Sequence, residues 1–94
     1  MAVKILIKRK IQDENLDALD FLLKKLRAAT VAQQGYISGE TYRRFDEEGE
    51  SLVISTWQNV DAWRKWFASD ERKEIQNQID LLTDEPTTYE IYIP

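Results

Sequence analysis

Cysteine and histidine are both absent from this chain of 94 residues. Without cysteine there is no disulfide framework and no thiolate nucleophile. Without histidine the chain lacks the usual general base near neutral pH, the usual zinc ligand and the usual proximal ligand of haem. We therefore predict neither a metal site nor a cofactor, and a general base would have to be a carboxylate or a tyrosine.

An excess of positive charge and a long apolar run are missing as well. The formal net charge is −4 and the isoelectric point is about 4.8, which does not suit a phosphate backbone as partner. The N-terminal segment lacks the continuous apolar stretch of a signal peptide, and no later run reaches membrane-spanning length. We expect a cytoplasmic protein that binds neither nucleic acid nor membrane.

The length and the apolar content fit one small globular domain, residues 1–94. Hydrophobic residues make up 43% and charged residues 32% of the chain, values that argue against disorder. A domain of this size buries only about 60–65% of its unfolded surface, so it gains stability from oligomerisation.

Hydrophobic periodicity predicts four strands and three helices. Asn15, Asn59 and Ser69 are each expected to cap the start of a helix, and a short break is expected before the third helix. Gly35 suits the left-handed conformation after the first helix. Alternating apolar and polar residues place the strands at 3–11, 36–45, 51–57 and 89–93.

The resulting order, βαββαβ, predicts an α+β domain of the ferredoxin-like kind, with a four-stranded antiparallel sheet and helices on one face. The other face should carry Lys4, Leu6 and Lys8 from the first strand, with Glu90 and Tyr92 from the last. Such a mixed face favours a homodimer in which the sheets of two copies pack together. The alternative is a solvated face whose lysine stems cover apolar surface.

The middle of the chain resembles a known family, the antibiotic biosynthesis monooxygenases. The residues that carry the resemblance, in order and spacing, are Gly35-Tyr36, Trp57, Asp61, Trp63, Trp66 and Ala68-Ser69-Asp70. The resemblance implies a dimeric α+β barrel built from two ferredoxin-like protomers. It also implies an activity, because some members oxidise aromatic polyketides or quinols with dioxygen and without metal or flavin.

The same resemblance assigns roles to particular residues. Trp57 corresponds to a tryptophan of the oxygenase pockets, whereas Val53 stands where such enzymes can carry an asparagine. Other relatives degrade haem, and there Trp66 corresponds to the tryptophan that distorts the ring. The axial histidine of those relatives corresponds to Gln76, which argues against haem degradation.

The candidate site residues follow from side-chain chemistry and strand parity. Arg9 interrupts an inward-facing apolar series on the first strand, and an inward arginine there needs a partner or a ligand. We predict that Arg9 and Trp57 are catalytic, with Arg9 polarising a ring oxygen and with Trp57 and Trp66 forming walls of the pocket. The residues predicted to bind substrate are Trp66, Tyr36, Trp63 and Phe67.

Two functions remain open at this point. The first is a cofactor-free oxygenase that acts on a small aromatic or quinol-like molecule held between the sheet and the helices. The second is a non-catalytic dimeric module that binds a small ligand or serves as a stress-related accessory protein. The tryptophan and phenylalanine spacing at Trp63, Trp66 and Phe67 also fits a plain core stripe without any ligand.

Overall fold

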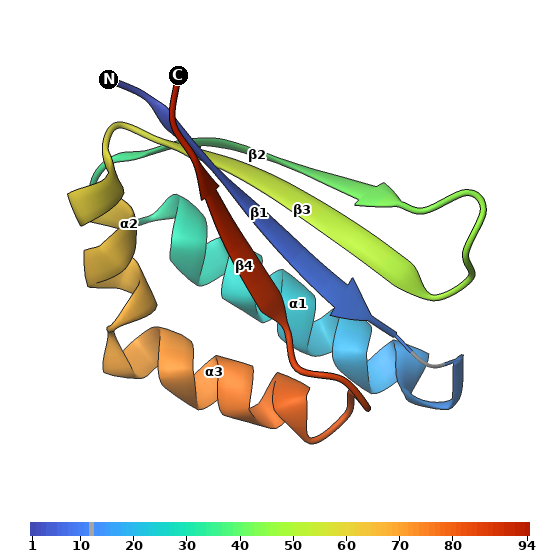
Figure 1. The fold of residues 1–94 in the computed structure, drawn as a ribbon. Coiled ribbons are helices and arrows are strands. Elements are labelled where there is room, and N and C mark those ends of the chain that lie inside the picture. Colours follow the sequence, from blue (N-terminus) through green and yellow to red (C-terminus); the bar gives the residue numbers. More distant parts are fainter. Residues whose placement is uncertain (12) are drawn as a thin grey trace.

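The computed structural model describes residues 1–11 and 13–94. Within these residues, four antiparallel strands form one sheet in the order β2-β3-β1-β4, and the three α-helices cover one face of it (Figure 1). The elements are β1 (Val3–Lys10), a single 3-10 turn (Asp13–Asn15), α1 (Leu16–Val31), β2 (Tyr36–Arg43), β3 (Glu50–Trp57), α2 (Val60–Phe67), α3 (Asp70–Asp80) and β4 (Thr88–Tyr92). This is the predicted ferredoxin-like fold.

The central strand β1 fixes which side chains face the helices. It pairs with β3 so that Val3 lies opposite Trp57 and Ile7 opposite Val53, and it pairs with β4 on its other edge. Because side chains alternate along a strand, Val3, Ile5, Ile7 and Arg9 share the helix-covered face. The inward position of Arg9 therefore agrees with the parity prediction.

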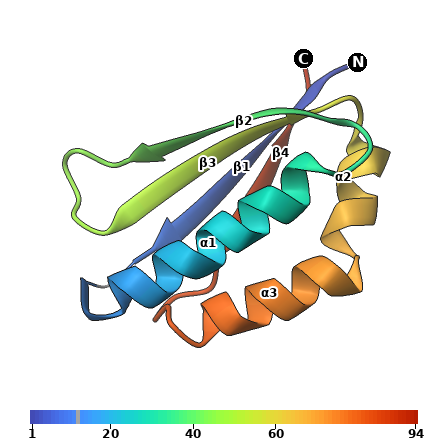
Figure 2. The same ribbon diagram turned by 180° about the vertical axis from the view of Figure 1, so that it is seen from behind.

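Helix α1 packs its apolar stripe on α3 beneath the sheet, as seen from behind in Figure 2. Leu19 and Ile79 are fully buried in this contact, which is where a helix with one apolar stripe gains most of its stability. The prediction for Asn15 was wrong in one respect. Its side chain does not cap α1, because the Asn15 Nδ2 instead donates a hydrogen bond of 3.2 Å to the Leu82 carbonyl oxygen.

The break between α2 and α3 falls where the sequence predicts it. Asn59 Oδ1 accepts a hydrogen bond of 2.8 Å from the amide of Ala62, and Ser69 Oγ accepts one of 3.2 Å from the amide of Arg72. Each side chain satisfies a backbone donor at a helix start, so both helices are capped separately. Helix α2 then turns its tryptophans into a core cluster with Val3, Ile5 and Trp57.

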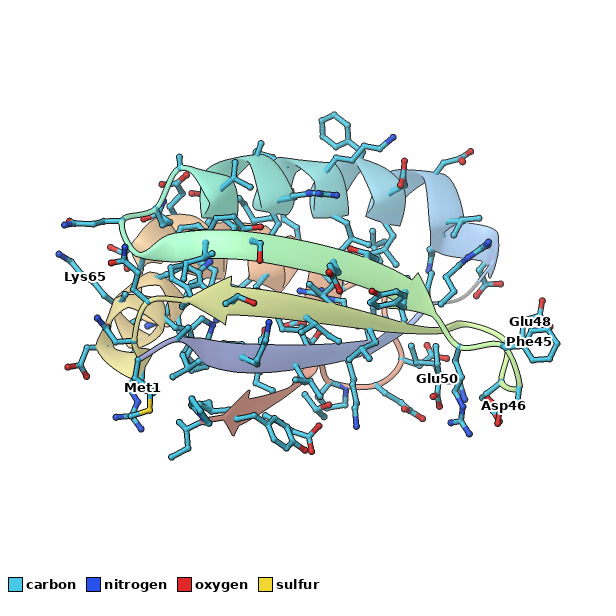
Figure 3. All side chains as sticks on the ribbon, turned by 90° about the horizontal axis from the view of Figure 1, so that it is seen from above. Met1, Phe45, Asp46, Glu48, Glu50 and Lys65 are labelled. Atoms are coloured by element: carbon cyan, nitrogen blue, oxygen red, sulfur yellow. The ribbon has the colours of Figure 1, made fainter. Side chains whose placement is uncertain are left out.

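The hairpin between β2 and β3 extends beyond the rest of the sheet, with Phe45 at its fully exposed tip (Figure 3). Strand β2 ends at Arg43, two residues earlier than predicted. Beyond it the Arg44 amide still donates a hydrogen bond of 2.9 Å to the Glu50 carbonyl oxygen. The Arg44 guanidinium bonds Asp46 at 2.6 Å and Glu50 at 2.9 Å and so closes the loop.

The second face of the sheet has no helix over it (Figure 3). Lys8 forms an ion pair of 3.1 Å with Glu90 on this face, and the Lys4 ammonium donates a hydrogen bond of 2.9 Å to Thr56 Oγ1. Tyr42 and Tyr92 lie on the same face and are about half exposed. None of the helices in the described residues is long and apolar enough to cross a membrane.

Candidate functional site

A cavity of about 410 Å³ lies between the helix-covered face of the sheet and the helices. Its walls include side chains from all four strands and all three α-helices of the described chain. Two other hollows, of about 460 and 550 Å³, open near the 83–87 loop and near the hairpin. We take the inner cavity as the candidate site because it combines apolar walls with a few polar groups, as small-molecule sites do.

Four of the predicted site residues supply the aromatic walls of this cavity: Tyr36, Trp63, Trp66 and Phe67. The rings of Trp63 and Phe67 are 4.9 Å apart between centroids. Tyr89 of β4 meets Phe67 edge-on at 5.0 Å and lines the cavity as well, although the sequence reasoning did not select it. The walls therefore suit a flat aromatic ligand.

Trp57 lies elsewhere, behind the wall. It is fully buried and is not among the lining residues, so the expectation that it forms a wall is not met in this structure. Its indole Nε1 donates a hydrogen bond of 3.2 Å to Ser55 Oγ, and its ring meets Tyr36 edge-on at 5.5 Å. Trp57 is buried because of the strand register: it lies opposite Val3 of β1 and opposite Tyr36 of β2 at the end of the sheet.

Arg9 lines the cavity and is 5% exposed. One guanidinium nitrogen, Nη2, donates a hydrogen bond of 3.1 Å to Gln76 Oε1. Among the described residues, the Arg9 Nε has no hydrogen-bond partner and the side chain forms no ion pair with a carboxylate. Burial lowers the pKa of Arg9, and the charge of Arg72 acts in the same direction, while Tyr89 and Asp80 raise it.

A second buried arginine, Arg72 of α3, lines the same cavity. Its Nε donates a hydrogen bond of 2.8 Å to the Phe67 carbonyl oxygen, and its Nη1 donates one of 3.0 Å to the Tyr89 hydroxyl. The guanidinium carbon lies 4.2 Å from the centroid of the Phe67 ring, a cation–π contact. These contacts leave Arg72 fixed in place without neutralising its charge.

Sequence reasoning missed Arg72 because α3 begins with a mixture of acidic and basic residues typical of a solvated helix. A signal was nevertheless present. Arg72 and Gln76 fall on the same helical stripe as Ile75 and Ile79, and all four are buried. A charged residue on an apolar stripe indicates a buried polar site, just as Arg9 does on its strand.

Gln76 connects the two parts of this polar network. Its Oε1 accepts from Arg9, while its Nε2 donates to Asp80 Oδ1 at 2.8 Å and to Thr87 Oγ1 at 3.1 Å. The position that the resemblance aligned with an axial histidine therefore holds an amide that bridges Arg9 and Asp80. Asp80 raises the pKa of Arg9 through its charge, while the hydrogen bonds between the two residues run through this neutral amide.

The charge lining the cavity is opposite in sign to that of the whole chain. Five lining side chains are basic and one is acidic, whereas the chain carries a formal charge of −4. The acidic one, Asp20, is more than half exposed and pairs with Lys24 at 2.9 Å. Among the described residues, no group of three or more carboxylates could hold a metal ion.

Chemically, the arrangement can hold a flat aromatic molecule with one polar end. The rings supply apolar contact, and the guanidinium groups of Arg9 and Arg72 can stabilise negative charge on an oxygen of the ligand. Because Arg9 and Arg72 are both buried, such an interaction is stronger there than at the surface.

Comparisons with known proteins place this geometry in a family. A family model described as antibiotic biosynthesis monooxygenase matches residues 2–78. No curated protein matches the chain.

Several solved structures share the fold at low sequence identity. A conserved protein from Methanosarcina mazei Go1 is 22% identical with a TM-score of 0.88, covering 98% of this chain and 91% of that one. Rv0793 from Mycobacterium tuberculosis is 20% identical with a TM-score of 0.86, covering 100% and 95%. SnoaB, a cofactor-independent oxygenase from Streptomyces nogalater, is 14% identical with a TM-score of 0.85, covering 99% and 92%.

Proposed function

Because the chain belongs to the antibiotic biosynthesis monooxygenase family, we propose that it is a cofactor-independent monooxygenase that oxidises a small aromatic or quinol-like molecule in the inner cavity. The observation that carries the proposal is Arg9, a buried cation on the wall of a cavity that is also lined by aromatic rings. A ligand oxygen next to Arg9 would gain negative charge more easily than in water.

The proposed reaction balances without an added reductant. A ring CH₂ group next to an oxygen-bearing ring loses a proton, and the resulting anion reacts with dioxygen to form a hydroperoxide. Loss of water from the hydroperoxide gives a carbonyl, so one oxygen atom enters the product and the other leaves as water. The four electrons that reduce dioxygen all come from the substrate carbon.

In this proposal the residues have distinct roles. Arg9 stabilises the ionised ring oxygen, while Trp66, Trp63, Phe67 and Tyr36 hold the rings. Trp57 acts through its edge-on contact with Tyr36 and is therefore a positioning residue. The prediction that Trp57 is catalytic assumed direct contact with the substrate. In the present proposal Trp57 acts indirectly, through Tyr36.

Oxygen uptake tests the proposal. The folded protein is mixed with a panel of anthrone- and quinol-type compounds, and dioxygen consumption is compared with the background rate. We expect uptake above background for at least one compound, with a product heavier by one oxygen atom and lighter by two hydrogen atoms. Background uptake with compounds shown to bind would rule the proposal out.

We also propose that two copies of this single domain, residues 1–94, pair through the uncovered face of the sheet in the cytoplasm. Support comes from Leu6 and Ile54, half-buried neighbours on a face that also carries exposed tyrosines. Strand β4 lies beyond the family match and yet pairs with β1, which supports one domain over the whole range. Light scattering should show twice the 11.1 kDa protomer mass, and a Leu6→Lys variant should shift it toward one protomer.

A second function, a non-catalytic module that binds a small ligand, is favoured by one specific observation. Val53 lines the cavity where oxygenases of this family can carry an asparagine. Native mass spectrometry of the purified protein would separate the two functions. An aromatic ligand carried through purification, together with background oxygen uptake, would favour the binding module.

A further inference from the structure

We propose that the polar end of the inner cavity is an anion site, formed by Arg9, Arg72 and the Tyr89 hydroxyl, that selects ligands bearing an ionised oxygen on an aromatic ring. The inference deepens the proposed function and rests on it in using the same cavity. It states that the ligand already carries the ionised oxygen when it binds, whereas the proposed reaction needs the anion only after a ring CH₂ group has lost a proton.

The first argument is the hydrogen-bonding capacity of Arg9. A guanidinium group carries five N–H donors, and Arg9 uses Nη2 on a neutral amide while its Nε has no partner among the described residues. A buried polar group without a partner costs free energy, and a buried charge costs more. The Nε itself is enclosed by protein atoms, and a negatively charged ligand oxygen in the cavity supplies a countercharge close to the guanidinium group.

The second argument is the neighbouring cation. Arg72 lines the same cavity, and its bonds to the Phe67 carbonyl and the Tyr89 hydroxyl leave its charge uncompensated by any carboxylate in the described chain. Two like charges facing one cavity repel each other; burial is the main cause of the lowered pKa of Arg9, and the charge of Arg72 adds to it. An anion between them removes this repulsion, and the Tyr89 hydroxyl, which accepts from Arg72, still has its own proton to donate.

The third argument is the absence of a competing base. Among the described residues that line the cavity, Asp20 is the one carboxylate, and it pairs with Lys24 on the exposed side of α1. The site therefore favours ionisation of a ligand hydroxyl by stabilising the anion, with the proton released to water. Removal of the proton by a protein carboxylate is not required.

Paired probes test the proposal with the unmodified protein. Naphthoate and naphthamide have the same ring system and similar shape, but only naphthoate is an anion at pH 7. We expect the protein to bind naphthoate about tenfold to a hundredfold more tightly, as charge-assisted hydrogen bonds predict, measured by calorimetry. Equal affinity, or no binding of either probe at millimolar concentration, would overturn the proposal.

Variants then assign the preference to Arg9. Arg9→Met should abolish the preference for naphthoate, Arg9→Lys should restore part of it, and Arg64→Met, which removes an exposed arginine of α2 outside the cavity, should leave it unchanged. Circular dichroism confirms that each variant is folded. A full preference retained in folded Arg9→Met would refute the assignment.

A chromogenic phenol distinguishes an ionised hydroxyl from a carboxylate. When nitrophenol binds, its absorbance titration should move to lower pH by about one unit, because tenfold tighter binding of the anion lowers the bound pKa by that amount. An unshifted titration of bound nitrophenol would restrict the site to carboxylates and overturn the hydroxyl part of the proposal. If naphthoate is preferred but oxygen uptake stays at background, the proposed monooxygenase function fails while the anion site stands.

Discussion

Replacing Arg9 by methionine should make the protein more stable while it removes the anion site. Arg9 is 5% exposed, forms one hydrogen bond to Gln76 and has no ion pair among the described residues. Its charge is therefore buried without an ion pair. Methionine is shorter than arginine, but its flexible apolar side chain replaces the stem and removes the charged group.

The expected magnitude follows from two opposing contributions. Loss of the Arg9–Gln76 hydrogen bond leaves the buried Gln76 Oε1 without its donor, at a cost of about 1–3 kcal/mol. Removing an unpaired buried charge gains several kcal/mol, since buried ions are replaced by apolar residues with a net gain of roughly 1–4 kcal/mol. We expect Arg9→Met to raise the free energy of unfolding by about 1 kcal/mol, which corresponds to roughly 4–8 °C in melting temperature.

Urea denaturation at one fixed protomer concentration measures this change, because oligomerisation makes stability depend on concentration. Arg64→Met serves as the control for loss of an exposed arginine and should change stability by less than about 0.5 kcal/mol. If Arg9→Met instead lowered stability by more than about 1 kcal/mol, Arg9 would be a structural residue held by Gln76, and its burial would no longer indicate a ligand.

Three further predictions concern single positions. Gly35→Ala should cost about 2 kcal/mol or more in urea unfolding, because Gly35 has a φ of 90° and an added Cβ would lie 2.5 Å from the Ala62 Cβ. Gly39→Ala should lower the free energy of unfolding by less than Gly35→Ala, because the added Cβ would crowd only the Tyr36 side chain. Equal losses of stability in the two variants would contradict this. Ile79→Ala should cost about 2–5 kcal/mol as a fully buried residue, and a loss below about 1 kcal/mol would contradict the packing. Arg44 lowers the pKa of Asp46, so this pairing stabilises at neutral pH and is lost as the pH falls through the folded pKa. The Asp46 titration followed by NMR should move to higher pH in Arg44→Met, and an unmoved titration would refute the pairing.

The sequence determined most of the fold because its local signals agree with one another. Apolar alternation from Val3 to Ile7 set the face of β1, and Asn59 and Ser69 marked helix starts that the structure confirms as caps. Gly35 is found with a positive φ as predicted. The end of β2 was misplaced because strand periodicity does not show that Arg44 bonds across the loop and closes it.

The candidate site was predicted only in part, and the reason is geometric. Parity alone placed Arg9 inside, because one strand position fixes the direction of its neighbours. Trp57 was expected to form a wall of the cavity. The pairing of β2 with β3 is irregular between Tyr36 and Ser38, and the Tyr36 ring packs edge-on against the Trp57 ring. Arg72 required knowledge of which helix faces the cavity, and that depends on packing rather than on its own sequence neighbours.

The hydrogen bond from Arg72 to the Phe67 carbonyl joins the end of α2 to the start of α3. The same guanidinium faces the cavity, so one side chain closes the helix junction and borders the ligand space. Local opening of the junction and occupation of the cavity are then thermodynamically linked. Amide protons around Ser69 should exchange with deuterium more slowly when the cavity is filled, which makes the junction a reporter of occupancy.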